Sequence, residues 1–121
     1  MALATTLLST ATVVAEPGRV AGDKLRQLLS GRTVIVNTPI GSLPITYREN
    51  GTMTGRAAAL AALTGREQDS GHWWIAGDQL CQRWRVWLDG SAHCFTLRVS
   101  GAQLHWRRGD GSSGTAVIAS R

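Results

Sequence analysis

The sequence predicts a mainly β protein, an antiparallel up-and-down meander of about seven or eight strands that closes into a small barrel, preceded by one short helix. Three observations support this fold class. Glycine occurs 14 times in 121 residues, and helix-forming runs are few, which favours short strands joined by turns. Beyond the helix, apolar residues recur at every second position, as in strands with one buried face. A sheet of that length must curl or close to bury its apolar face.

The chain divides into an N-terminal segment, 1–15, and a single β-barrel domain, 16–121. The first segment is uncharged and mostly apolar, and "VVA" before Glu16 fits the small-residue rule of signal peptidase. No Lys or Arg follows Met1, so a disordered tail is the alternative to a signal peptide. The run is too short to span a membrane. After cleavage the mature protein begins near Glu16, in an oxidising compartment and without a membrane span.

The stretch "GDKLRQLLSG" (Gly22–Gly31) predicts the helix, over about residues 23–30. The carboxylate of Asp23 is suited to cap the first backbone N–H groups. Gly31 suits the left-handed residue that ends many helices. The apolar face consists of Leu25, Leu28 and Leu29. A helix of about two turns is marginal alone, so these leucines must pack on the barrel.

Strands are predicted over about residues 33–119. "TVIVNT" (Thr33–Thr38) is β-branched, and Asn50–Gly51 marks a hairpin because both residues tolerate positive φ. The run Ala57–Gly65 is open between a helical turn, a strand and a packed loop. "REQDSG" (Arg66–Gly71) predicts a loop.

The C-terminal hairpin gives the clearest alternation. We place its two-residue turn at Ser100–Gly101, which separates an apolar from a polar face. The apolar pairs are then Val99 with Ala102, Leu97 with Leu104, and Phe95 with Trp106. The polar pairs are Arg98 with Gln103, Thr96 with His105, and Cys94 with Arg107. "GDGSSG" then turns the chain into the last strand.

The two cysteines are predicted to form a disulfide. By alternation Cys81 and Cys94 lie on the polar faces of neighbouring strands, where they can bridge. Closing the intervening loop is worth about 3 kcal/mol in the entropic description. A tight hairpin at Asp89–Gly90 would hold the two apart, so the bridge requires a wider loop over Trp84–Ser91, with Trp84 and Trp87 on it.

The segment Gly71–Phe95 holds both cysteines and four of the five tryptophans, a composition that also raises the question of a metal site or a catalytic site. The histidines and cysteines lack zinc-ligand spacings such as C-x-x-C, so we predict no metal and no cofactor. His93 precedes Cys94, and alternation directs the two side chains to opposite faces, which leaves a cysteine nucleophile without its base. We therefore predict no catalytic residue and no enzyme activity.

Three motifs carry a resemblance to a known family: "YRENGTMTG", "GHWWIAGDQLCQRW" and "HCFTLRVSGAQLHWRRGDG". They resemble a group of small exported proteins of unassigned function, mainly from proteobacteria, over roughly Leu28 to Ile118. The "AAALAAL" run departs from that frame. The resemblance implies a periplasmic, calycin- or lipocalin-like small barrel and implies no activity. The segment from Trp74 to Cys81 is also similar, more faintly, to periplasmic inhibitors of secreted metalloproteases.

We therefore expect a periplasmic or secreted, monomeric binding or accessory protein without enzymatic activity. Its ligand is a small apolar or anionic molecule at the barrel mouth, or a periplasmic partner protein. The predicted aromatic walls are Tyr47, Trp73, Trp84, Trp87 and Trp106. The predicted partners of an anionic group are Arg83, Arg85 and Arg107. Core packing and a solvated surface are the alternative roles of these residues.

Two other functions remain open. A protease inhibitor or other protein-interaction barrel would use Glu16–Gly22 as an extended arm. An oligonucleotide-binding barrel would use the net charge of +5 and the aromatic residues. The arginines are scattered, without a block of like charge, and export opposes nucleic-acid binding, so no nucleic-acid partner is expected.

Overall fold

A computed structural model describes residues 18–119. The predicted signal peptide, 1–15, lies outside these residues, as does the beginning of the predicted arm. The helices are α1 (Gly22–Leu29), α2 (Ala58–Thr64) and the 3-10 helix η1 (Trp87–Gly90). The strands are β1 (Arg19–Val20), β2 (Arg32–Thr38), β3 (Gly41–Tyr47), β4 (Thr52–Arg56), β5 (Gln68–Ala76), β6 (Gln79–Trp84), β7 (Ala92–Ser100), β8 (Gln103–Arg108) and β9 (Ser113–Ile118).

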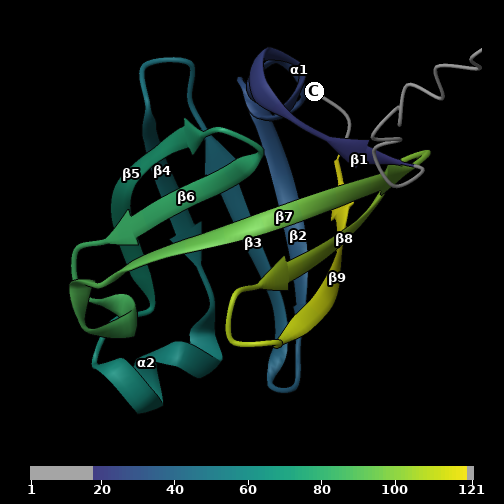
Figure 1. The fold of residues 1–121 in the computed structure, drawn as a ribbon. Coiled ribbons are helices and arrows are strands. Elements are labelled where there is room, and N and C mark those ends of the chain that lie inside the picture. The colour runs from purple at the N-terminus through teal and green to yellow at the C-terminus, as the bar shows by residue number, and fades with distance from the viewer. Residues whose placement is uncertain (1–17, 120–121) are drawn as a thin grey trace, which may run out of the picture.

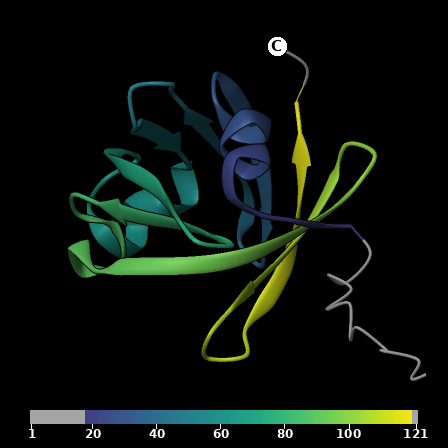
Figure 2. The same cartoon turned by 45° about the horizontal axis from the view of Figure 1, so that its top comes forward.

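The strands β2 to β9 form a closed antiparallel barrel of eight strands, which confirms the predicted fold class (Figure 1). Each strand pairs with the next in sequence, and β9 returns to pair with β2. β7 runs across the molecule and pairs with β6 near its start and with β8 towards its end (Figure 2). β1 is an extra strand on β7, with Val20 opposite Leu97. Residues 19 and 20 are thus held against the barrel and are not part of a protruding arm.

Helix α1 closes one end of the barrel (Figure 1). Leu25 and Leu29 are fully buried, and the backbone N–H of Gly31 donates to the carbonyl of Tyr47 at 2.8 Å. Gly31 has a φ of 73°, as predicted for the residue that follows a helix. Asp23 was predicted to cap the helix, but the helix begins at Gly22, so Asp23 lies within the first turn and makes no capping bond.

The opposite end of the barrel is surrounded by the β2–β3 hairpin, α2, η1 and the β8–β9 hairpin (Figure 1). We call this end the mouth. Of the three structures left open for Ala57–Gly65, the chain adopts the helix, α2. The loop predicted over Arg66–Gly71 is wrong from Gln68 onward, because β5 begins there. Asp69 lies inside that strand, opposite Gly55 of β4.

The β7–β8 hairpin has the predicted faces but a different register. Its turn is Gly101–Ala102, with Val99 opposite Leu104 and Leu97 opposite Trp106. Gly101 has a φ of 60°, and hairpin turns of two residues favour glycine at the first central position. A shift by two residues leaves every side chain on the same face, which is why alternation alone did not identify the turn.

The loop between β6 and β7 is wide, as the disulfide requires. Cys81 lies opposite Cys94 in the sheet, and the structure joins them by a disulfide on the outer face of the barrel. Cys81 is buried, and on its other side it lies opposite Trp74 of β5. Trp84 was predicted to lie on the loop, but β6 continues through it, and its side chain faces inward.

Candidate functional site

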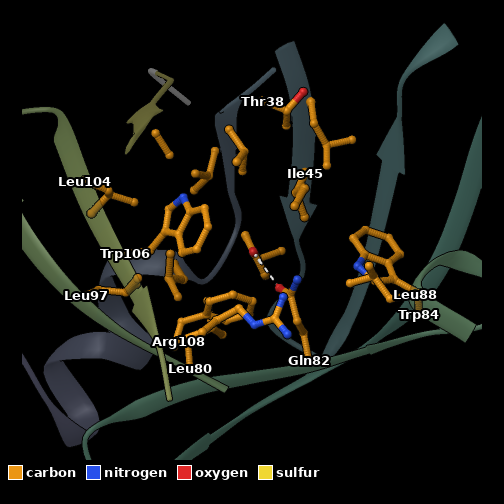
Figure 3. Close-up of a pocket in the computed structure, with 17 residues that line it drawn as sticks. Thr38, Ile45, Leu80, Gln82, Trp84, Leu88, Leu97, Leu104, Trp106 and Arg108 are labelled. Carbon is orange, nitrogen blue, oxygen red and sulfur yellow. Dashed lines mark hydrogen bonds between the residues drawn. The ribbon is translucent and has the colours of Figure 1, made fainter. Parts of the chain in front are cut away.

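The barrel interior holds a cavity of about 270 Å³ (Figure 3). At its closed end it reaches Leu29 of α1, and the side chains around it are mostly aliphatic or aromatic. Leu88 of η1 lines the cavity and is also 49% exposed, so the cavity opens to solvent at the mouth. The interior is therefore a hollow apolar site and not a fully packed core.

Two interior glycines make room for the tryptophans that form the cavity wall. A Cβ on Gly114 of β9 would lie 2.5 Å from Cζ2 of Trp106. A Cβ on Gly55 of β4 would lie 2.8 Å from Cη2 of Trp84 and 2.7 Å from Cζ3 of Trp87. These distances are too short for any side chain, so glycine at both positions leaves the space that the rings occupy.

One side of the cavity is polar. The hydroxyl of Tyr47 donates to Oε1 of Gln82 at 3.0 Å, and both residues line the cavity. Burial raises the pKa of the Tyr47 phenol well above its usual range, so Tyr47 remains a neutral donor at physiological pH. Gln82 is held with its carboxamide directed into the cavity (Figure 3).

The raised pKa of Tyr47 can be checked directly, because Tyr47 is the only tyrosine of the chain. An unperturbed tyrosine has a pKa of about 10 and is half ionised at that pH. We expect the native protein to show no phenolate absorbance there. The neutral phenol of Tyr47 contributes to the free energy of unfolding because its pKa is raised in the folded protein. This contribution is complete below about pH 10 and is lost as the pH rises further. Native protein that titrates like its urea-unfolded form would contradict the buried phenol.

Arg108, at the end of β8, is the cation of the cavity. It shares its inward face with Leu104 and Trp106, and its Nη2 lies 3.3 Å from Oδ2 of Asp110 in the β8–β9 hairpin. Hydrogen bonds from the side chain and backbone of Ser112 hold the pKa of Asp110 below its usual range. Asp110 is thus ionised at neutral pH and holds the arginine from the outer side of the mouth.

The five predicted aromatic residues separate into two groups. Tyr47, Trp84 and Trp106 line the cavity. Trp73 and Trp87 are buried in the core. Trp73 packs edge-on against Tyr47, and Trp87 packs against Trp84 with the two ring planes tilted by 54°. Trp73 and Trp87 thus support the wall.

The three predicted arginines lie on the outer face, away from the cavity. Nε of Arg83 donates to the carbonyl of Gly90 at 2.7 Å, which ties β6 to the loop that follows it. Arg85 follows the end of β6, and Arg107 lines a hollow on the outer surface with Arg98. None of the three can pair with a ligand inside the barrel.

The sequence reasoning missed Arg108 and Gln82. Both signals were present in the alternation: Arg108 shares the parity of Trp106, and Gln82 shares the parity of Leu80. Alternation predicts one apolar and one polar face for each strand, and so assigns each polar residue to the outside. Gln82 and Arg108 are exceptions, because the cavity leaves space inside the barrel for polar side chains.

Among the helices within residues 18–119, none is long and apolar enough to cross a membrane. No protein-family model, curated protein or solved structure matches the chain.

Proposed function

We propose that this protein is a non-enzymatic binding protein that takes up a small, largely apolar molecule through the mouth of its barrel. The observation that carries this proposal is the open cavity lined by Leu29, Leu97 and Trp106. Concave, mostly apolar sites with a few polar groups are the usual form of small-molecule sites, and barrel mouths are a usual place for them.

The size of the cavity limits the ligand. Its volume of about 270 Å³ corresponds to roughly nine water molecules at about 30 Å³ each. Typical sites for drug-sized ligands begin at about 300 Å³. The ligand is therefore a small molecule of roughly ten non-hydrogen atoms, such as a short hydrocarbon chain with one polar end.

A periplasmic or secreted location is part of the proposal. The disulfide between Cys81 and Cys94 supports it, because such bridges persist in oxidising compartments and are rare in reducing ones. The apolar leader at residues 1–15 supports the same location.

A cavity-filling variant tests the function. Ala116 is buried on β9 and lines the cavity, so the ring of Ala116→Phe must enter the empty space. We expect calorimetry to show that 1-octanol binds the native protein, with a negative heat-capacity change from buried apolar surface. Ala116→Phe should weaken this binding at least roughly tenfold, a loss of about 1.4 kcal/mol.

The matched control is Val117→Phe, on the outer face of the same strand. Val117 is 43% exposed, so its replacement adds the same ring without touching the cavity and should leave octanol binding unchanged. Absence of octanol binding to the native protein, or equal loss in both variants, would refute a cavity site.

A further inference from the structure

The amide of Gln82 is an unused donor inside an apolar cavity. The residue is 7% exposed, and its Oε1 is occupied by the hydroxyl of Tyr47. Its amide nitrogen makes no hydrogen bond to any other residue in the part of the chain that the structure describes, and it is directed into the cavity (Figure 3). A ligand that fills the cavity removes solvent from this donor, and a buried donor without a partner is costly. The donor therefore favours a ligand that brings an acceptor.

Arg108 supplies further donors to the same part of the cavity. Figure 3 shows its guanidinium and the carboxamide of Gln82 both directed inward from the strands that carry them. In the sheet, Arg108 lies opposite Phe95 of β7, and Phe95 lies opposite Leu80 of β6. Gln82 is two residues from Leu80 on the same inward face, so the long arginine side chain extends from β8 towards it.

The polar side of the cavity therefore offers the amide donor of Gln82 and a guanidinium that is paired with Asp110 on one side. Asp110 binds the guanidinium from the hairpin, where its own side chain is 55% exposed, so its charge lies towards solvent. A guanidinium presents five donors and pairs with a carboxylate through two parallel bonds. Such a pair is stronger beside apolar walls than in water.

We propose that the ligand of the cavity is a short-chain carboxylate whose head group binds Arg108 and the amide of Gln82. Its hydrocarbon tail packs against the aliphatic wall that includes Leu29 and Leu97. This inference rests on the proposed binding function and adds the charge of the ligand and its direction in the barrel. The carboxylate lies on the side of Gln82 and Arg108, and the tail fills the apolar remainder of the cavity.

The test compares octanoate with 1-octanol, which have the same carbon chain and differ in the head group. At pH 7 octanoate is ionised, since carboxyl groups titrate near pH 4 to 5 (about 4.3 for glutamate). We expect calorimetry to show octanoate binding roughly tenfold to a hundredfold tighter than octanol, the range of a hydrogen bond to a charged group. Arg108→Gln should remove this preference, so that octanoate and octanol bind the variant with equal affinity.

Arg107→Gln is the matched control, because it removes the same charge from the neighbouring residue on the outer face. It should leave the preference for octanoate intact. A second measurement needs no variant: lowering the pH through the carboxyl pKa should bring octanoate affinity down to that of octanol.

The possible outcomes separate the two proposals. Equal affinity for octanoate and octanol would refute the carboxylate site and leave the apolar binding function standing. Equal loss in Arg107→Gln and Arg108→Gln would also refute it, because the preference would then come from overall charge. If neither compound binds the native protein, the binding function itself fails.

Discussion

Replacing Trp87 by alanine is expected to lower the free energy of unfolding by about 3–5 kcal/mol, the usual cost of truncating a buried tryptophan. Trp87 is 2% exposed, and its ring centroid lies 4.8 Å from that of Trp84. Its Nε1 donates to the carbonyl of Arg66 at 3.1 Å, and its backbone N–H donates to Oδ2 of Asp69 at 2.9 Å. One residue thus joins the segment after α2, strand β5 and the loop before β7 at the mouth.

The loss would be a large fraction of the roughly 5–15 kcal/mol that stabilises a typical domain. Urea unfolding followed by circular dichroism measures it. Trp74→Ala is the control, because Trp74 lies on the outer face and is 38% exposed. Its replacement should cost about 1 kcal/mol or less. Equal losses in the two variants would show that Trp87 does not anchor the mouth.

Removing the disulfide is expected to cost about 3 kcal/mol, the entropic value for a loop of this size. Cys81 and Cys94 are thirteen positions apart and lie opposite each other on β6 and β7. We expect Cys81→Ala/Cys94→Ala to unfold at a clearly lower urea concentration than the native protein. The strand register should survive, because the flanking pairs Leu80–Phe95 and Gln82–His93 do not involve sulfur.

A reducing agent provides the internal control for this prediction. It should destabilise the native protein to about the level of the double variant and leave the double variant unchanged. Native protein that is insensitive to reduction in its unfolding midpoint would show that the bridge contributes nothing to the fold.

Alternation in the sequence was enough to predict the barrel and the inward face of its apolar side chains, but not the inward face of Gln82 and Arg108. Phe95, Leu97 and Trp106 all face the interior as expected, because a side-chain period of two is local information. The exact pairing is not local. The β7–β8 turn lies one residue later than predicted, because Gly101, with its positive φ, takes the first central position of the turn. This difference moves no side chain of the hairpin to the other face.

The site was harder to predict, because it depends on what the interior leaves empty. Periodicity places Phe95, Leu97 and Trp106 on an inward face, but it does not say which inward side chains border a cavity and which are packed behind its wall. Asp69 illustrates the same limit. It lies in a polar stretch that predicts a loop, and its role appears only when Trp87 and Val86 fold back to bind its carboxylate.

The role of the two glycines that face tryptophans also cannot be predicted from the residue pattern of one strand. Gly55 and Gly114 look like ordinary turn or strand breakers in the sequence, and each lies within a strand. Their function is set by the rings of Trp84 and Trp106 from other strands of the barrel. Contacts of this kind fix the shape of the cavity, and only the closed barrel brings them together.

The central claim is that the barrel takes a small molecule into its interior, and magnetic resonance tests this most directly. With 1-octanol bound, we expect nuclear Overhauser contacts from the alkyl chain to the ring of Trp106 and the methyl groups of Leu97, both inside the barrel. Contacts confined to outer-face side chains such as Trp74 and Val117, with none to Trp106 or Leu97, would contradict it.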